Sequence, residues 1–466
     1  MDELMDSPAD LAVTGGRVVT PDGVREATVV VSGKRIGAVL DGDDLPVSVP
    51  RLRADGCYVL PGLVDSHVHF RTPGLEHKED WAHGSRAAVA GGVTTVIDMP
   101  NTVPPGLDPE AMVAKAALVA GSSLVDYRFH IGVDPRRPEL LAGLSPEIAV
   151  SAKVFMAGHH TAPTVVRDPA RLDEIFAAAA AGGVQLVLHA EDDALFALLD
   201  NWRGEPRDYR DYERRRPRSG GIAAVATVLE LVRRHGTRAH VLHLSSAEEA
   251  DLMAAAQAAG LPVTFELTGH HLSFTDADTL KMGARTRLSP AIRSQDDQDR
   301  LWAALWAGEV ASLGSDHAPH TIAEKSRRVA DAPPGLPGVQ ELATAVWTGM
   351  RRRRPDEPAD VAIARLVEHL AARPAAMFRL PGKGRLEPGA DADLVIFDPD
   401  RPTMFSARDV YAKCGWSAYE GWTMAGRVRT TLKAGRVAWD AERRAFGPPT
   451  GRWLGTAARE PAGRLA

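Results

Sequence analysis

Short apolar runs alternate with longer amphipathic segments through the middle of the chain. The runs are rich in β-branched residues, as buried strands are, and the segments between them repeat apolar residues with the period of an α-helix. The predicted strands cover residues 58–69, 94–99, 126–133, 150–156, 184–189, 239–244, 263–267 and 310–315. The predicted helices cover residues 79–90, 109–119, 169–181, 222–234, 247–259 and 295–307. This alternation predicts a closed (β/α)8 TIM barrel, with an open doubly wound sheet as the alternative.

Both ends of the chain carry a different pattern, in which short strand-like runs are separated by glycine-containing turns. The two ends share the tripeptide Gly-Arg-Val, at 16–18 and again at 435–437. Because chain ends often lie close together, we expect a small β-sandwich domain formed by both termini. The predicted division is 1–61 for the first part of the β-sandwich, 62–380 for the barrel, and 381–466 for the second part and the C-terminal tail.

Composition excludes several classes of protein. The 466 residues carry a net charge of −6, whereas a general nucleic-acid binder is usually basic. Cys57 and Cys414 are the only cysteines, which excludes a disulfide framework and a cysteine-only zinc site. No apolar run approaches the ~20 residues that span a bilayer, and residues 1–10 lack the order of a signal peptide. We therefore expect a cytoplasmic protein with no nucleic-acid or membrane partner.

Polar side chains that bind metals or move protons stand at the ends of the predicted strands. In a (β/α)8 barrel, active residues come from the carboxyl ends of the strands. The first strand ends in His67 and His69, and alternate residues of a strand point to one side. Later strands contribute Lys153, His189, His243 and Asp316. A single strand-end histidine is usually structural, but we expect the six together to surround one mouth of the barrel.

This set of side chains predicts a metal centre. Nitrogen and oxygen ligands without cysteine suit Zn²⁺. Six ligands are too many for one tetrahedral metal site with an open position. Two metal ions about 3.5–4 Å apart would use all of them. A lysine in a strand that is buried on both faces needs a partner or a changed charge state, and Lys153 carbamylated by CO2 would become a bridging carboxylate. Water between two cations ionises near neutral pH and attacks a carbonyl carbon, so we expect hydrolysis of an amide-like or ester-like bond, or the reverse closure.

Several segments near the strand ends carry recognisable motifs. Residues 61–71 read Pro-Gly-Leu-Val-Asp-Ser-His-Val-His-Phe-Arg, and 91–95, 99–102 and 316–320 read Gly-Gly-Val-Thr-Thr, Met-Pro-Asn-Thr and Asp-His-Ala-Pro-His. The first resembles the opening motif of the cyclic amidohydrolases, and the others resemble dihydroorotases, over nearly the whole chain. The resemblance implies one zinc on His67, His69 and Asp316 and a second on His189 and His243, bridged by a carboxylated Lys153. It also makes Asp316 the general base and acid.

The resemblance implies a site for a substrate carboxylate as well. Arg71, Asn101 and His320 match the residues that bind it in dihydroorotases, and a guanidinium can hold a carboxylate through two hydrogen bonds. Ser289 stands at a fourth substrate-binding position, where these enzymes usually have asparagine, and Gly269 stands where proline is usual. The histidines of 158–161 and 269–271 are expected in exposed loops, with a place in the lining of the pocket as the alternative. Residues 333–340 resemble the loop that encloses the substrate, and their glycines would allow it to move.

The sequence thus predicts a zinc-dependent dihydroorotase, which interconverts L-dihydroorotate and N-carbamoyl-L-aspartate in pyrimidine biosynthesis through a metal-bridging hydroxide. Because of Ser289 and Gly269, an allantoinase, a hydantoinase or another hydrolase of cyclic ureides or imides is the main alternative. A non-catalytic, dihydroorotase-like scaffold is a further alternative, although such relatives have typically lost metal ligands and all six are present here. We also expect a homo-oligomer, either a dimer or a tetramer.

Overall fold

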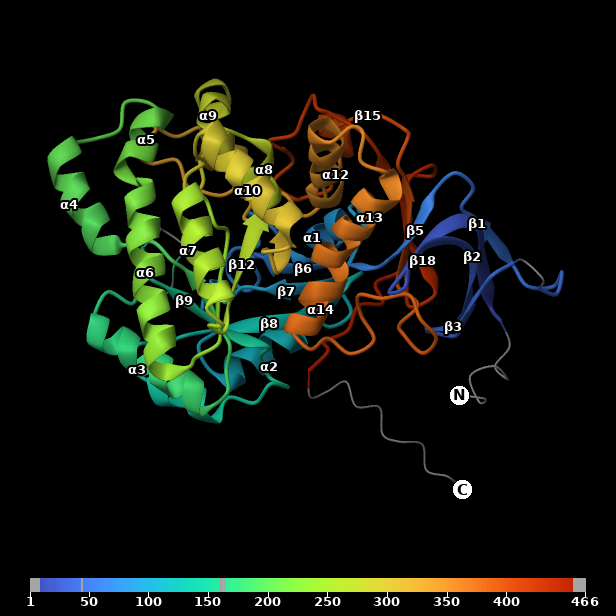
Figure 1. Ribbon diagram of the computed structural model, residues 1–466, viewed down its shortest axis with the longest axis horizontal. Coiled ribbons are helices and arrows are strands. Elements are labelled where there is room, and N and C mark those ends of the chain that lie inside the picture. The colour runs from blue at the N-terminus through green and yellow to red at the C-terminus, as the bar shows by residue number, and fades with distance from the viewer. Residues whose placement is uncertain (1–8, 43–44, 159–161, 163, 456–466) are drawn as a thin grey trace.

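A barrel of parallel strands forms the larger part of the molecule (Figure 1). The computed structural model describes residues 9–42, 45–158, 162 and 164–455. Within them the barrel strands are β6 (Leu63–Val68), β7 (Val93–Asp98), β8 (Asp126–Gly132), β9 (Ser151–Phe155), β10 (Leu186–His189), β11 (Ala239–Val241), β12 (Val263–Thr268) and β13 (Ser312–Gly314), paired in chain order. A parallel bridge between Val68 and His317 joins the last strand to the first. The predicted (β/α)8 barrel is confirmed.

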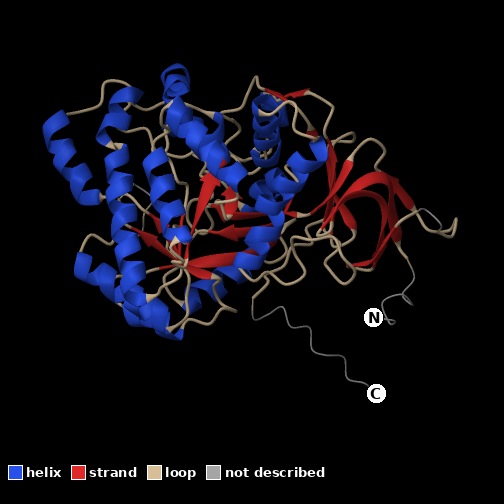
Figure 2. Ribbon diagram, viewed as in Figure 1, coloured by secondary structure: helices blue, strands red, loops and turns tan. Residues whose placement is uncertain are grey.

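Helices surround these strands (Figures 1 and 2). The six predicted helices are present as α1 (Trp81–Ala90), α2 (Pro109–Val119), α3 (Pro169–Ala181), α6 (Arg218–His235), α7 (Ala247–Ala258) and α10 (Gln295–Ala307). Local sequence explains their ends. Asp108 and Asp168 cap α2 and α3, each followed by proline. Ser294 begins α10 with a capping box, and Gly308 ends it in the left-handed conformation.

The prediction missed the other α-helices of the described residues, most of them short but two, Asp193–Arg203 and Leu342–Arg353, as long as helices that it found. These are α4 (Asp193–Arg203), α5 (Tyr209–Arg215), α8 (Gly269–Ser273), α9 (Asp276–Met282), α11 (Ile322–Lys325), α12 (Leu342–Arg353), α13 (Ala359–Val367) and α14 (Arg373–Met377). The elements η2 (Pro138–Gly143), η3 (Gly283–Thr286), η4 (Glu368–Ala372) and η5 (Ala407–Asp409) are other helical turns. Most of them are too short to show a full amphipathic period, and that period is the main sequence signal for a helix.

The first predicted strand, 58–69, is two strands in the structure. It breaks at Gly62 into β5 (Tyr58–Pro61) and β6, which belong to different sheets. Gly62 N–H donates to Asp393 O at 2.8 Å, and a Cβ at Gly62 would overlap the Thr94 side chain. The chain therefore passes from the sheet that contains β5 into the barrel at Gly62, a glycine that packs closely against Thr94 of the barrel and against Asp393, which precedes β14 (Leu394–Asp398) of that sheet.

Strands from both ends of the chain form the second sheet. Its nine strands in the described residues are β1 (Leu11–Thr20), β2 (Gly23–Ser32), β3 (Arg35–Leu40), β4 (Arg51–Arg53), β5, β14 (Leu394–Asp398), β17 (Arg427–Lys433), β18 (Arg436–Asp440) and β19 (Ala445–Phe446). Antiparallel pairing of β5 with β14 joins the two termini, as expected. A separate pair, β15 (Thr403–Met404) and β16 (Thr423–Met424), lies outside this sheet. The exact domain boundaries stay a prediction.

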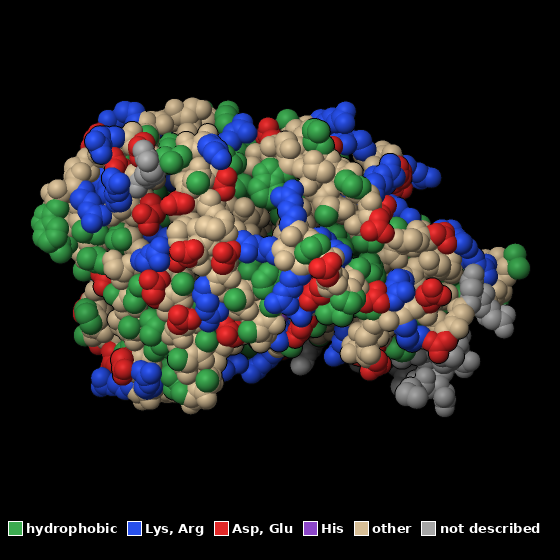
Figure 3. Space-filling view, turned by 45° about the horizontal axis from the view of Figure 1, so that its top comes forward, with side chains coloured by type: hydrophobic (Ala, Val, Ile, Leu, Met, Phe, Trp, Pro, Cys, Tyr) green, Lys and Arg blue, Asp and Glu red, His purple; other side chains and the backbone are tan. Residues whose placement is uncertain are grey.

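The surface agrees with a chain of mixed charge. On the face in Figure 3, basic and acidic side chains are interspersed, and ion pairs such as Arg300–Asp251 and Arg353–Asp299 join them. Among the described residues, no helix is both long and apolar enough to span a membrane.

A buried ion cluster ties the barrel to the sheet. Lys383 Nζ lies 2.6 Å from Asp126 Oδ2, 2.7 Å from Asp391 Oδ2 and 2.8 Å from Asp393 Oδ2. Lys433 Nζ lies 2.9 Å from the same oxygen of Asp126. Asp126 begins barrel strand β8, whereas Lys433 ends β17 of the sheet. The two ammonium groups, with the Arg452 guanidinium 3.5 Å from Asp391 Oδ2, thus balance the charge of three carboxylates that could otherwise hold a metal ion.

Replacing Lys383 with methionine is expected to destabilise the fold by about 3–5 kcal/mol, because it leaves buried carboxylates without their main partner. Burial raises the pKa of Asp393, but the charges of Lys383 and Lys433 outweigh it and leave that pKa below its ordinary value. The stability from this pairing is therefore present above about pH 4 and is lost as the pH falls through the folded pKa. Urea unfolding at pH 7 and at about pH 2, below the ordinary pKa of an aspartate, measures both effects. Lys34→Met, at an exposed turn, is the control and should change neither.

Candidate metal centre and substrate pocket

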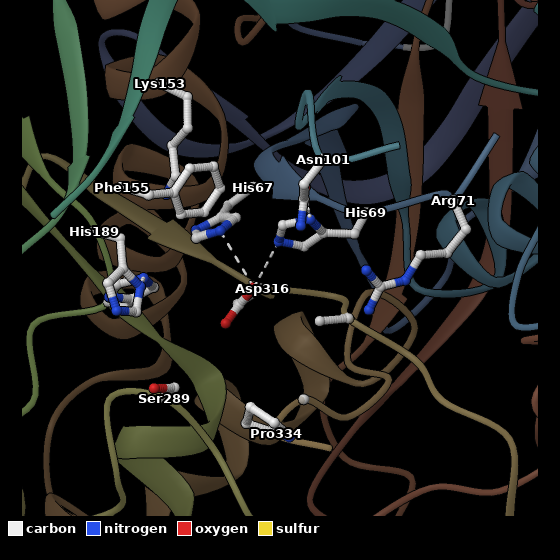
Figure 4. Close-up of a pocket in the computed structure, with 13 residues that line it drawn as sticks. His67, His69, Arg71, Asn101, Lys153, Phe155, His189, Ser289, Asp316 and Pro334 are labelled. Carbon is white, nitrogen blue, oxygen red and sulfur yellow. Dashed lines mark hydrogen bonds and ion pairs between the residues drawn. The ribbon is translucent and has the colours of Figure 1, made fainter. Parts of the chain in front are cut away.

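The six predicted metal ligands line one pocket at the carboxyl ends of the barrel strands. Asp316 lies at its centre (Figure 4), and its Oδ1 is 3.2 Å from His67 Nε2 and 3.1 Å from His69 Nε2. On the other side, His189 Nδ1 lies 3.1 Å from His243 Nε2. Lys153 comes from β9, with its Nζ 4.8 Å from the centre of the Phe155 ring. The structure thus brings together all the side chains that the strand ends predicted.

The backbone at this end of the barrel is held tightly. Phe70 N–H donates to Asp98 Oδ1 at 2.7 Å, and Lys115 pairs with the same carboxylate. His69 N–H donates to His317 O at 2.9 Å, which links the ends of β6 and β13. Asp316 has a φ of 41°, in the left-handed region that few residues other than glycine adopt. Strained backbone of this kind clusters at functional sites.

Buried acceptors set the orientation of three histidines. His67 Nδ1 lies 2.7 Å from Glu266 Oε1, and His189 Nε2 lies 2.8 Å from Glu191 Oε2. His69 Nδ1 lies 2.6 Å from Asn101 Oδ1. When an acceptor takes the N–H of one ring nitrogen, the lone pair of the other nitrogen points into the site, as in metal-binding histidines. Sequence reasoning missed Glu191 and Glu266, although a glutamate inside the apolar strand β12 was a visible signal.

The charge states favour metal binding. Burial is the main cause that lowers the pKa of His67, His69 and His243, so these rings are neutral and can offer a lone pair. Burial also lowers the pKa of Lys153 to about 7, which leaves much of its amine uncharged at neutral pH. His67, His69 and Asp316 offer ligand atoms within 4.8 Å of one another. Neutral imidazoles with a carboxylate and no thiol fit Zn²⁺ or a similar divalent ion.

Arg71 forms a cationic edge of the pocket. Its side chain is buried, and its NH2 nitrogen donates to Pro319 O at 3.3 Å. Its Nε and NH1 have no hydrogen-bond partner within the described part of the chain. Burial lowers the pKa of Arg71 to about 10, so the guanidinium stays charged at neutral pH. A charged group at the wall of a pocket with two unused donors is suited to an anionic ligand.

The other predicted substrate residues lie in different surroundings. Asn101 lines the pocket, with its Oδ1 bonded to His69. Ser289 also lines it, and its Oγ donates to Glu191 Oε2 at 3.2 Å, which ties it to the His189 side of the site. His320 is fully buried behind Arg71, with Nε2 3.5 Å from the arginine NH2 nitrogen and 3.0 Å from Pro334 O. His320 is therefore placed to support Arg71 and the pocket wall.

The prediction of exposed loop histidines at 269–271 is wrong. His270 and His271 are buried in α8, a short helix capped by Thr268, which accepts from His271 N–H. Helix α8 packs against α10 and α12, and this packing removes both rings from solvent. His159, His160 and Thr161 lie outside the described residues.

Comparison with known proteins agrees on the type of chemistry and differs on the substrate. Residues 58–438 match the Amidohydrolase family. An allantoinase of Streptomyces avermitilis is 35% identical over 458 residues, 98% of this chain and 100% of that protein. A dihydroorotase of Halobacterium salinarum is 36% identical over 429 residues, 91% of this chain and 96% of that protein. The structure of the L-hydantoinase (dihydropyrimidinase) from Arthrobacter aurescens superposes with a TM-score of 0.90 at 28% identity, covering 96% of this chain and 99% of that one.

Proposed function

The chain belongs to the amidohydrolase family and is a cyclic amide hydrolase, and from that premise we propose that it is a dihydroorotase. It would interconvert L-dihydroorotate and N-carbamoyl-L-aspartate in pyrimidine biosynthesis. The observation that carries this proposal is the buried guanidinium of Arg71, with its unpaired Nε and NH1, at the wall of the pocket. A buried charge without a partner is costly, and a substrate carboxylate would supply one. Dihydroorotate has such a carboxylate, whereas allantoin and simple hydantoins do not.

The residues of the chain divide the work of ring opening. His67, His69 and Asp316, with His189, His243 and a carboxylated Lys153, would hold two divalent ions, which supply activation of a water molecule and polarisation of the ring carbonyl when bound. Asp316, partly open to the pocket, would take the proton of that water on its carboxylate. The water oxygen would bond to the ring carbonyl carbon, and Asp316 would deliver the proton to the ring nitrogen as the carbon–nitrogen bond breaks. Ring closure reverses these transfers.

Allantoinase is the second candidate. Similarity to the Streptomyces avermitilis enzyme extends over 98% of this chain, and Ser289 departs from the dihydroorotase pattern. Ring opening of dihydroorotate, allantoin and hydantoin by the purified, zinc-loaded enzyme separates the candidates. The proposal requires dihydroorotate to have the highest kcat/KM. A higher value for allantoin would replace dihydroorotase by allantoinase.

Replacing Arg71 with methionine is expected to raise the KM for dihydroorotate by about 10- to 100-fold, because charge-assisted hydrogen bonds to the carboxylate are lost. The kcat should change much less, since Arg71 is assigned to the carboxylate and not to the reacting bond. Steady-state kinetics in both directions measure the effect. Arg443→Met, at an exposed arginine in the turn between β18 and β19, is the matched control. An unchanged KM would remove Arg71 from the substrate site.

A further inference from the structure

One wall of the pocket is held by buried side chains through its backbone carbonyls. Pro334 and Gly335 line the pocket. Lys325 Nζ donates to Pro333 O at 2.9 Å and to Gly335 O at 2.7 Å. His320 Nε2 lies 3.0 Å from the carbonyl oxygen of Pro334, the residue between Pro333 and Gly335. Three consecutive carbonyl groups are thus bonded by two side chains that follow Asp316 in the sequence.

The backbone N–H groups of Gly335 and Gly338 are hydrogen-bonded as well. Gly335 N–H donates to Arg287 O at 2.9 Å, and Gly338 N–H donates to His317 Nδ1 at 3.1 Å. Gly335 has a φ of 123°, and a Cβ there would lie 2.5 Å from Ala318 O. The segment is therefore fixed by its neighbours on both sides, even though its glycines and prolines suggest a mobile loop.

Lys325 is unusual among the lysines of this chain. It is 3% exposed, and no ion pair joins it to a carboxylate in the part of the chain that the structure describes. Its Nζ lies 5.7 Å from the centre of the Trp416 ring, which closes the other side of the amine. Four other buried lysines pair with a carboxylate: Lys115, Lys383 and Lys433 each with an aspartate, and Lys78 with Glu324. Lys153, at 1% exposed, is the other buried lysine without an ion pair in the described residues, and it lies in the proposed metal centre. Burying an amine without an ion pair costs folding free energy. Because the hydrogen bonds of this amine go to the pocket wall, its contribution is to hold that wall in place.

We propose that Lys325 is a positioning residue that determines substrate selectivity by holding 333–335 as a rigid wall of the substrate pocket. We expect a fixed wall to favour a small ring that carries a carboxylate over a ring with a bulky substituent. The identity of the preferred substrate rests on the proposed function, whereas the rigidity of the wall does not.

Lys325→Met tests the proposal, because it keeps the length of the side chain and removes its donors. The KM for dihydroorotate should rise about tenfold with kcat changed less than about threefold. Relative turnover of a hydantoin with a bulky 5-substituent should increase, and amide hydrogen exchange over 333–339 should accelerate. Lys325→Gln, which retains two N–H donors on a shorter chain, should restore part of the wild-type KM. Lys281→Met, at an exposed lysine of α9, is the control.

Hydrogen exchange in the wild-type enzyme keeps the test valid if Lys325→Met fails to fold. Slow exchange of the Gly335 and Gly338 amides is expected, and exchange at the rate of an exposed loop would overturn the proposal. A fall in kcat with KM unchanged in Lys325→Met would also overturn it. If dihydroorotate proves not to be the substrate while exchange accelerates in Lys325→Met, the proposed function fails and the rigid wall stands.

Discussion

Replacing Asp316 with asparagine is expected to lower kcat by a factor of about 10²–10⁴, the usual contribution of a positioned general acid and base. The asparagine keeps an oxygen near His67 Nε2 and His69 Nε2, both within 3.2 Å of Asp316 Oδ1 in the structure, so the metal content should fall only in part. The amide cannot accept a proton from water or pass one to the ring nitrogen. Steady-state kinetics and metal analysis of the same preparation measure the two quantities separately.

Asp251→Asn on α7 changes an exposed carboxylate in the same way and should leave both quantities unchanged. Wild-type turnover in Asp316→Asn would refute the assignment of Asp316 as acid and base. A loss of activity that follows the loss of metal in strict proportion would assign Asp316 to metal binding alone.

Replacing Lys153 with methionine is expected to lower kcat by at least about 100-fold, because the anion proposed to bridge the two metal ions is lost. The metal content should fall from two ions per chain toward one or none. In the metal-free state the variant should be at least as stable as the metal-free wild type, because a buried amine is replaced by an apolar side chain of similar length. Metal analysis, kinetics and thermal unfolding of one preparation test the three effects together.

Native mass spectrometry of the wild-type enzyme provides the complementary measurement. A mass increase equal to one CO2, lost in Lys153→Met and kept in the Lys281→Met control, would support the carbamate. Full activity with two metal ions in Lys153→Met would contradict the role of Lys153 as a bridging ligand.

The barrel could be predicted because its signals are local. Each of α2, α3 and α10 has the predicted bounds, since a cap and an amphipathic period lie within the same short stretch. Helices such as α8 and α9 are set by packing around the pocket and are too short for a period to be visible. The break at Gly62 was missed for a related reason, because the close approach of Thr94 and Asp393 that requires it comes from other parts of the chain.

By itself, the sequence determined the barrel and the six candidate ligands. Five of the ligands stand at or just beyond a strand end and Lys153 lies within β9, and the barrel topology brings these strands together whatever lies between them. Only the tertiary structure decided what surrounds those ligands. Glu266 meets His67 across 199 residues, and Lys383 meets Asp126 across 257. The surroundings of Arg71, whose Nε and NH1 have no partner in the described residues, and the carbonyls held by Lys325 likewise depend on burial and on neighbours distant in the sequence. No local pattern of residues encodes those contacts.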